Sequence, residues 1–370
     1  MKKATLKQIA ELAGVSLTTV HRALNGKGGC SKEVEEKILR IAREQGYTLN
    51  IAAASLRKQP VQIAMIFPFR DKGGRFGLDR ILDGYIEYRR AVVQYNIVYQ
   101  EFLLRSSDVK EEFFMDRSYP ELEHILTQIL QEQPVRYDGV IIYGMSVNGR
   151  AVELLGRIRA SGTKVIVIER QLEELANACT VRSDNAIAAN LAAEMLSKGI
   201  RNPGTVMLFS KLLPGGDPCA DICAQAIAAQ RPELKVVQLP IVMNSDVSDI
   251  IAREMEKYPD LRGMFATSGR HTNSMLTAMA KLGIKPESTV GCELFDESYQ
   301  ALHDGTLDVI IDRRPEKLGY LSLRMMLSAL ANITALPELY EVPPRIVLRA
   351  NSDAYFHRRK YHFDMSAEEE

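Results

Sequence analysis

No stretch of this 370-residue sequence is apolar over the roughly 18 residues that a membrane-spanning helix requires. The first residues include lysines and lead into an amphipathic segment, which is unlike the apolar region of a secretory signal. These two absences predict a protein that has no transmembrane helix and stays in the cytoplasm.

Sequence motifs of common enzyme chemistries are missing as well. We find no P-loop, no GxGxxG after an expected strand, no GxSxG turn and no histidines at metal-ligand spacing. The cysteines form no CxxC pattern: Cys30, Cys179, Cys219, Cys223 and Cys292. Two of them, Cys219 and Cys223, share a helix face and are typical of small core residues in a reducing compartment. The sequence therefore predicts a protein that is not an enzyme and binds no cofactor or metal.

The net charge is zero, with 47 basic and 47 acidic residues, which by itself argues against a nucleic-acid-binding protein. The charges are unevenly distributed, however, because residues 1–60 contain 11 Lys and Arg against 5 Asp and Glu. Positive charge is thus concentrated in the N-terminal segment, as phosphate neutralisation requires. The length, with 46% hydrophobic and 25% charged residues, is typical of a globular protein of two or three domains.

The N-terminal segment has the pattern of two short helices joined by a tight turn. Apolar residues at positions i, i+3, i+4 and i+7 give the first helix one buried face: Leu6, Ile9, Ala10 and Ala13. Gly14 suits the left-handed end of that helix, and Ser16 is a good N-cap for the second. A third helix is expected after Ser31. We interpret residues 1–46 as a helix-turn-helix domain, which places its second helix in the DNA major groove.

Residues 47–60 connect this domain to the rest of the chain and include an alanine-rich segment from Asn50 to Lys58. The segment is too short to be a stable helix on its own, and Pro60 follows it. Leu56 is the bulky apolar residue near its C-terminal end. From the residues alone, Leu56 is either a wedge for the DNA minor groove or a linker residue that packs on the next domain.

From Val61 onward, buried strands alternate with helices in two successive units of similar size. This alternation predicts right-handed βαβ units and parallel sheets covered on both faces. The expected fold is an α helix-turn-helix head followed by an α/β core of two doubly wound lobes over residues 61–365. We place the N-lobe at 61–198 and 313–335, the C-lobe at 199–312 and 336–365, and a disordered acidic tail at 366–370. Ligands of such sheets bind at the carboxyl ends of the strands, in a cleft between the lobes.

The segment at 5–26, TLKQIAELAGVSLTTVHRALNG, resembles the DNA-binding head of the LacI/GalR family of bacterial transcription regulators. The resemblance continues to the linker motif SLR at 55–57 and, more weakly, to three core motifs: VRSDN at 181–185, VGCEL at 290–294 and DRRP at 312–315. It implies a homodimeric repressor that binds a pseudopalindromic operator, and a periplasmic-binding-protein-like core that senses a small molecule. A sugar-binding protein of transport or sensing type is the alternative for the core, but a transport protein would lack the head.

The resemblance also assigns roles to residues of the head. Leu17, Thr18 and Arg22 match positions that read bases, and Arg22 can donate two hydrogen bonds to a guanine. Positions that contact phosphates are matched by Thr5, Ser16, Thr19 and Asn25. The predicted DNA-binding set is completed by Leu6, His21, Ser31, Asn50, Ala53 and Leu56. Leu56 matches the intercalating leucine of the linker, whereas His21 stands at a usual serine and either contacts a phosphate or is an ordinary solvated residue.

The predicted effector-binding set lies in the core: Phe76, Arg170, Asp184, Ser268, Glu293 and Arg313. Glu293 replaces an aspartate that is usual in the family, and Arg313 replaces a usual glutamine. A carboxylate suits hydroxyl groups, whereas an arginine suits a phosphate or a carboxylate. We therefore expect a carbohydrate effector that carries an acidic group. Ion pairs at the surface or between the lobes are the alternative interpretation of Arg170 and Asp184.

Overall fold

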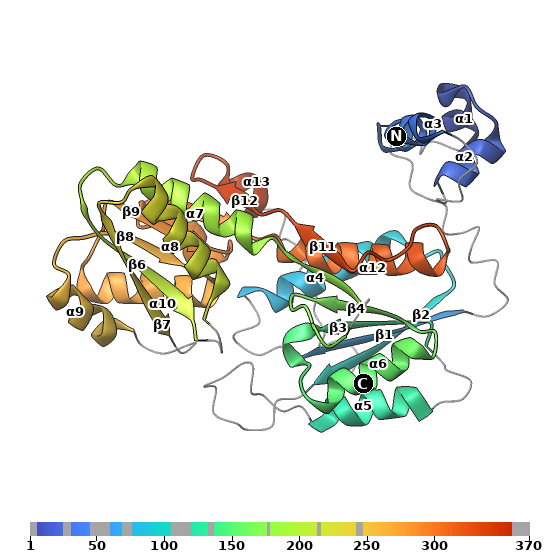
Figure 1. Ribbon diagram of the computed structural model, residues 1–370, viewed down its shortest axis with the longest axis horizontal. Helices are drawn as coiled ribbons and strands as arrows, with labels where there is room; N and C mark the ends of the chain where they lie inside the picture. The colour runs from blue at the N-terminus through green and yellow to red at the C-terminus, as the bar shows by residue number, and fades with distance from the viewer. Residues whose placement is uncertain are drawn as a thin grey trace.

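The computed structural model describes residues 6–24, 31–44, 60–68, 76–104, 120–131, 137–175, 178–212, 216–241 and 247–356 (Figure 1). These residues form a small helical head and two α/β lobes, each built around a six-stranded sheet. Within these ranges, no helix is long and apolar enough to cross a membrane.

The head consists of three helices, α1 (Leu6–Ala13), α2 (Leu17–Leu24) and α3 (Lys32–Glu44). They share one small core, in which Ile9 and Ile38 are fully buried. Gly14 follows α1 with a φ of 71°, a conformation that glycine adopts without steric cost, so the chain turns sharply into α2. The Ser16 hydroxyl caps α2 by accepting a hydrogen bond from the Thr19 amide at 3.1 Å. The predicted helix-turn-helix arrangement is therefore present.

The N-lobe contains a parallel sheet with the strand order β11-β5-β4-β3-β1-β2. Its strands are β1 (Val61–Pro68), β2 (Ile97–Leu104), β3 (Gly139–Tyr143), β4 (Lys164–Ile168), β5 (Cys179–Ser183) and β11 (Leu339–Val342). Its helices are α4 (Leu78–Ala91), α5 (Pro120–Gln131), α6 (Arg150–Ala160) and α12 (Pro315–Leu330). Helices α4 and α12 cover one face of the sheet, and α5 and α6 cover the other. Because both faces are covered, the central strands are apolar on both sides.

The C-lobe repeats this architecture with the strand order β12-β10-β9-β8-β6-β7, in which β12 runs antiparallel to β10. Its strands are β6 (Gly204–Lys211), β7 (Leu234–Ile241), β8 (Leu261–Ala266), β9 (Ser288–Cys292), β10 (Val309–Asp312) and β12 (Arg345–Val347). Its helices are α7 (Asn185–Gly199), α8 (Pro218–Gln230), α9 (Ser248–Lys257), α10 (Gly269–Leu282), α11 (Asp296–Asp304) and α13 (Ser352–Phe356). Helices α7 and α8 cover one face, and α9, α10 and α11 cover the other. The two doubly wound lobes confirm the predicted fold class.

Two predicted lobe boundaries are wrong. Residues 185–198 are predicted in the N-lobe, but they form α7, whose buried Ala188 and Ala192 pack in the core of the C-lobe. Strand β11 falls in the segment 336–365 that is predicted in the C-lobe, but it pairs with β5 of the N-lobe. The alternation of strands and helices shows that a helix exists between β5 and β6, but it does not show which of the two sheets the helix covers. In the described part of the chain, the lobes are therefore joined between β5 and α7, between β10 and α12, and between β11 and β12.

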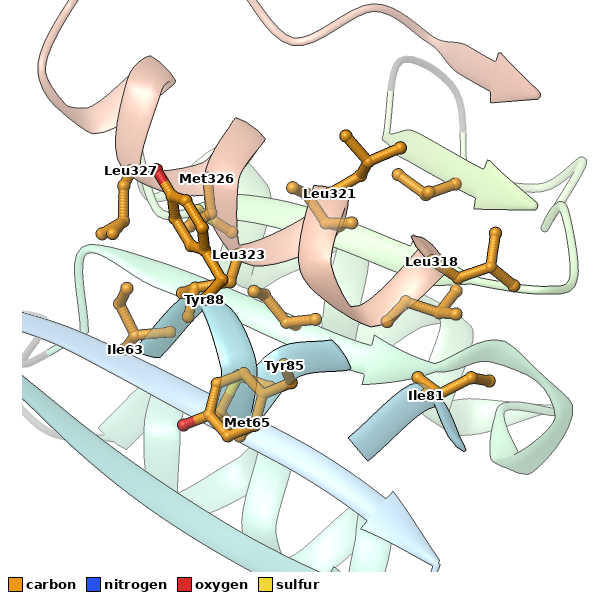
Figure 2. Packing of buried hydrophobic residues seen from close by; sticks show 14 of the residues in the cluster. Ile63, Met65, Ile81, Tyr85, Tyr88, Leu318, Leu321, Leu323, Met326 and Leu327 are labelled. Carbon is orange, nitrogen blue, oxygen red and sulfur yellow. The ribbon is translucent and has the colours of Figure 1, made fainter. Parts of the chain in front are cut away.

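Helices α4 and α12 approach each other closely on the face of the N-lobe sheet, where Tyr88 and Leu318 belong to one apolar cluster (Figure 2). Glycines permit this approach. A Cβ atom on Gly84 would lie 1.7 Å from the Glu316 carbonyl oxygen, and the contact on Gly319 is equally close. The packing fixes the first turn of α4 against the start of α12, at the junction of the two lobes.

Candidate functional site

The residues expected to read DNA lie on the outer side of α2. Leu17 is 51% exposed although it is a large apolar residue, and Thr18 and Arg22 are exposed near it. Val20 and Ala23 point to the opposite side of the helix and are buried in the core of the head. This helix thus presents an apolar side chain, a hydroxyl and a guanidinium together, which are groups that contact base edges in a major groove.

Two residues of the predicted DNA-binding set, Ser16 and Ser31, are helix caps. Ser31 accepts a hydrogen bond from the Val34 amide at 3.4 Å and so caps α3. The hydroxyl oxygens of Ser16 and Thr19 lie 2.8 Å apart at the start of α2. Hydroxyl and amide groups at a helix N-terminus are suited to phosphate oxygens. A phosphate-binding role of these residues stays a prediction.

The structure does not describe the other predicted DNA contacts. Leu6 and His21 lie in α1 and α2, but their side chains are outside the described part of the chain. Five predicted contacts lie entirely outside the described residues: Thr5, Asn25, Asn50, Ala53 and Leu56. Their roles stay predictions.

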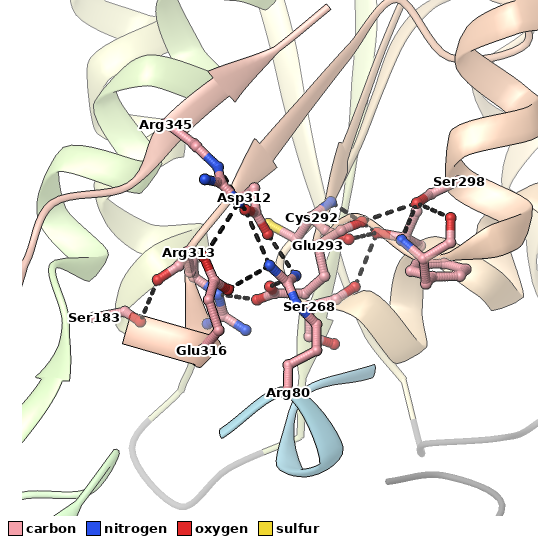
Figure 3. Close-up of polar contacts among 12 residues, drawn as sticks. Arg80, Ser183, Ser268, Cys292, Glu293, Ser298, Asp312, Arg313, Glu316 and Arg345 are labelled. Carbon is pink, nitrogen blue, oxygen red and sulfur yellow. Dashed lines mark hydrogen bonds and ion pairs between the residues drawn. The ribbon is translucent and has the colours of Figure 1, made fainter. Parts of the chain in front are cut away.

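A cluster of charged side chains joins the two lobes (Figure 3). Arg80 extends from the first turn of α4 and donates to both carboxylate oxygens of Asp312, Nη1 to Oδ1 at 2.6 Å and Nη2 to Oδ2 at 3.2 Å. Its Nη2 also donates to Glu316 at 2.6 Å. Arg345 holds Asp312 from the other side, with its Nε 2.8 Å from Oδ2. Asp312 ends β10 of the C-lobe, whereas Arg80 and Glu316 belong to helices of the N-lobe, so the cluster fixes one lobe against the other.

The buried carboxylate of Asp312 is ionised in this cluster. Burial alone raises the pKa of Asp312, but the charges and hydrogen bonds of Arg80 and Arg345 outweigh it and hold this pKa well below its usual range. Burial disfavours the charged form of Arg80 in the same way, but three neighbouring carboxylates raise its pKa. The ion pairs therefore persist at every physiological pH.

Glu293 and Arg313 form the second part of the cluster. Glu293 follows β9, is 3% exposed and adopts a φ of 64°, which is uncommon for a residue with a side chain. Its Oε1 accepts a hydrogen bond from Arg313 Nε at 2.7 Å, and its Oε2 lies 3.5 Å from Arg80 Nη1. Burial raises the pKa of Glu293, and Asp312 acts in the same direction, against the two guanidinium groups. These two core residues, which depart from the family pattern, thus contact each other.

Phe76 brings an aromatic side chain to the same place from the N-lobe. Its ring lies edge to face with that of Phe295 of the C-lobe, with centroids 4.9 Å apart. Gly269, the first residue of α10, leaves room for both Phe76 and Glu293, because a Cβ atom there would lie about 3 Å from each. The structure therefore brings together three members of the predicted effector-binding set, Phe76, Glu293 and Arg313.

Ser268 lies next to this group but has a role in the C-lobe itself. Its hydroxyl caps α10, accepting from the His271 amide at 3.3 Å, and lies 3.1 Å from His271 Nδ1. His271 is fully buried, and its Nε2 is 3.3 Å from the Ile241 carbonyl oxygen. Burial, together with the positive charge of Lys211, lowers the pKa of His271 to about 4. The imidazole is therefore neutral, and its partners place the proton on Nε2.

Arg170 and Asp184 make local structural contacts. Arg170 Nη1 donates to the Val147 carbonyl oxygen at 2.9 Å, and Asp184 caps α7 by accepting from the Ile187 amide at 2.8 Å. Both contacts stabilise chain segments that follow strands of the N-lobe. Neither contact is one of the ion pairs that the sequence offers as an alternative, and an effector role of these residues stays a prediction.

Two functional candidates escape the sequence patterns. Arg80 lies in the core-facing stripe of α4 with Ile81, Gly84 and Tyr88, and an arginine in an apolar stripe is a signal that a buried carboxylate is near.

The second candidate, Asp217, accepts hydrogen bonds from the Lys211 and Cys219 amides and from the Thr267 hydroxyl, the last at 2.7 Å. Burial raises the pKa of Asp217, but the Lys211 charge and these bonds outweigh it and lower the pKa. Its position before Pro218 predicts a helix cap but not this network.

A helix-turn-helix head joined to a two-lobed α/β core is the architecture of a DNA-binding protein with a ligand-sensing core. Residues 5–50 match the family of bacterial regulatory proteins, lacI family, and residues 119–333 match the periplasmic binding protein domain. The second match spans more than half of the chain. The chain therefore belongs to the periplasmic binding protein domain family, with a head of the lacI family of bacterial regulatory proteins. This confirms the resemblance to LacI/GalR regulators, a regulatory rather than an enzymatic family.

Known proteins are similar to one or both parts of this chain. The ribitol operon repressor of Klebsiella aerogenes is 47% identical over 75 residues, which are 19% of this chain and 28% of that protein. The ribose operon repressor of Halalkalibacterium halodurans is 23% identical over 351 residues, 93% of this chain and 96% of that protein. The chain spans less than a third of the length of the first curated relatives that it matches. The ABC-transporter solute-binding protein of Actinobacillus succinogenes 130z with bound D-allose has the core fold, with a TM-score of 0.64 and 18% identity over 80% of this chain and 100% of that one.

Proposed function

We propose that this protein is a sequence-specific transcription repressor whose operator binding is controlled by a small carbohydrate effector. The observation that carries the proposal is the exposed set of Leu17, Thr18 and Arg22 on α2, in a head that matches the lacI family. Relatives named as repressors of ribitol and ribose operons, and a structurally similar protein with bound D-allose, support a sugar-type effector. A DNA-binding role places the protein in the cytoplasm.

DNA binding proceeds through a homodimer. Each head places α2 in the major groove of one half-site of a pseudopalindromic operator, and Arg22 reads a guanine. Ser16 and Thr19 at the start of α2 hold a phosphate, as does Ser31 at the start of α3. The linker at residues 47–60 inserts Leu56 into the minor groove between the two half-sites.

Control proceeds through the core. The effector occupies the space at the carboxyl ends of the strands of both sheets, next to Phe76, Glu293 and Arg313. A change in how the lobes meet there alters the arrangement of the two N-lobes in the dimer, and with it the spacing of the heads. A coupling free energy of about 1 to 3 kcal/mol between effector and operator is enough for regulation.

A gel-shift titration of the full chain with the DNA upstream of its own gene tests this function. We expect a sequence-preferring complex that weakens as salt is added, because phosphate contacts release counterions. Arg22→Gln should lower specific affinity about 10-fold or more, because a bidentate contact to a base is lost. The matched variant Arg157→Gln on α6 should bind as the parent does. Binding without sequence preference or salt dependence would exclude the repressor function.

A further inference from the structure

The guanidinium group of Arg313 is only partly used by the protein. Its side chain is 12% exposed, its Nε donates to Glu293 at 2.7 Å, and its Nη1 lies 3.5 Å from Asn185 Oδ1. Nη2 has no hydrogen-bond partner among the described residues. A guanidinium that is nearly buried normally uses most of its donors. The donors of Nη1 and Nη2 that remain unused among the described residues are therefore available for a further acceptor.

Glu293 differs from Arg313, because both of its carboxylate oxygens face charged groups of the protein. One oxygen accepts from Arg313 and the other faces Arg80, and the residue is almost completely buried. Because both oxygens face guanidinium groups of the protein, we assign this carboxylate to holding Arg313 and not to binding the hydroxyl groups of a ligand. Its effect is to fix the orientation of Arg313 through Nε, which leaves the end of the guanidinium pointing away from the ion pair.

Charged groups around Arg313 indicate what this edge binds. Lys211 ends β6, and Arg313 directly follows β10. The positive charges of both residues act to lower the pKa values of the same three buried side chains, Cys219, His271 and Cys292. The two cations therefore lie close together at the carboxyl ends of these strands. The Lys211 ammonium has no hydrogen-bond partner among the described residues. The carboxylates nearby are already occupied, Glu293 by arginines and Asp217 by three donors.

One further carboxylate acts on Arg313 from the N-lobe. Glu169 follows β4 with a φ of 75°, and its charge acts on the Arg313 guanidinium. Its carboxylate has no hydrogen-bond partner within the described part of the chain. A free carboxylate suits hydroxyl groups, whereas the end of a guanidinium suits two oxygens of a carboxylate or phosphate.

We infer that Arg313 is the specificity-determining residue of the effector site, that Glu293 is its positioning residue, and that the effector is a polyhydroxy compound with an oxyanion. The oxyanion accepts from Nη1 and Nη2 of Arg313, and Glu169 accepts from hydroxyl groups of the same molecule. This assignment rests on the proposed function, because it concerns the ligand of the same core. It reverses the expectation from sequence that the carboxylate of Glu293 contacts the effector.

Calorimetric titration of the full chain tests this inference with matched probes: D-glucose, D-glucuronate, D-glucose 6-phosphate and the corresponding pentose set, with inorganic phosphate alone. We expect at least one sugar oxyanion to bind at least 10-fold tighter than its neutral counterpart. The uronate and phosphate arms distinguish the two kinds of oxyanion. Neutral sugars that bind as tightly as their acids, or a set in which no oxyanion binds, would overturn the inference.

Variants separate the two roles. Arg313→Gln should lower oxyanion affinity at least 10-fold, and Arg313→Lys should restore only part of it because it keeps the charge but not the two parallel donors. Glu293→Gln should also weaken binding, and adding it to Arg313→Gln should have no further effect, because it acts through Arg313. Arg182→Gln, which breaks the exposed pair with Glu341, is the control for loss of an arginine. Additive losses, or an unchanged affinity of Arg313→Gln, would overturn the assigned roles.

A gel shift on the same preparations keeps the two proposals apart. Operator binding without oxyanion binding would overturn only the effector class. Loss of sequence-preferring DNA binding in the parent protein would overturn the repressor function, whatever the calorimetry gives. Melting temperatures of the unliganded variants show whether Arg313→Gln still folds, and Arg313→Lys supplies the comparison if it does not.

Discussion

Arg80 illustrates how a buried charge can organise a protein at the scale of one residue. The Arg80 side chain is 9% exposed, yet it contacts carboxylates from both lobes. Transferring a charge from water into the protein interior costs free energy. Removing one partner of a buried ion pair therefore destabilises the protein, because it leaves the other charge uncompensated. The contribution of Arg80 to stability therefore consists mainly of compensating the buried negative charge of Asp312.

Replacing Arg80 with methionine should destabilise the protein by about 3 kcal/mol or more, because Asp312 and Glu293 each lose a buried partner. Chemical denaturation monitored by circular dichroism measures this change. Arg89→Met is the matched control on the same helix, since Arg89 pairs with Glu101 where both side chains are more than a third exposed. That variant should lose about 1 kcal/mol at most. Equal losses in the two variants would contradict a structural role of the interlobe cluster.

His271 gives the stability of the protein a defined pH dependence. Its pKa is lowered from 6.5 to about 4, with burial as the main cause. Above pH 6.5 the imidazole is neutral in both the folded and unfolded chain. As the pH falls towards 4, the unfolded chain takes up a proton that the folded chain cannot accept, so stability is lost over this range.

We therefore expect the free energy of unfolding to fall by about 3 kcal/mol between pH 6.5 and pH 4 through His271. Urea unfolding at a series of pH values measures the slope. His271→Gln keeps a side-chain amide near the Ile241 carbonyl and should show a flatter profile over the same range. A variant with the slope of the parent would show that the acid lability has another origin.

Sequence patterns located some site residues and missed others for a physical reason. Glu293 and Arg313 could be selected because they stand in motifs that resemble those of the LacI/GalR core, and both follow strands, where ligands of such sheets bind. Their mutual hydrogen bond could not be predicted, because it depends on a positive φ at Glu293 and on the chain crossing at Arg313. Arg80 was missed because helical periodicity alone does not reveal a carboxylate from a distant segment.

At the scale of elements, alternation of strands and helices was sufficient to predict two doubly wound lobes. It was insufficient to assign α7, since the helix lies between β5 of one lobe and β6 of the other. The alanines of α7 let α8 pack closely beside it, and this contact places the helix in the C-lobe. Similarly, β11 is a short strand whose lobe depends on pairing with β5 rather than on its own pattern.

The contact of α4 with α12 leads to a prediction about glycine. Gly319→Ala would place a Cβ atom 1.8 Å from the Ile81 carbonyl oxygen, so the two helices must separate. We expect a loss of about 1 to 3 kcal/mol in the free energy of unfolding, measured by chemical denaturation.

Gly156 in α6 supplies the control for that substitution. A Cβ atom there would lie 3.6 Å from Leu175 Cδ1, which is an ordinary contact. Alanine in a helix interior is more stable than glycine by roughly 0.5 to 1 kcal/mol, so Gly156→Ala should be neutral or stabilising. A similar loss in both variants would mean that backbone conformation, not the helix contact, determines the effect.

At the scale of the whole molecule, the proposed repressor depends on two heads acting together. Each head is a small domain in which few exposed residues are proposed to read bases, so we expect one head on one half-site to bind weakly. Joining two heads through dimeric cores makes the second contact intramolecular, which raises affinity without any new interaction. The gain is lost when geometry prevents both heads from binding at once.

DNA geometry therefore tests the assembly. Once the operator is located, we expect a duplex with both half-sites to bind at least about 100-fold tighter than a duplex with one half-site replaced, in gel-shift titrations at fixed salt. Inserting about 5 base pairs between the half-sites turns one of them to the opposite side of the helix and should remove most of this gain, although every base contact is still present. Equal affinity for one and two half-sites would show that the heads bind independently, and the core would then have no means of controlling the operator through their spacing.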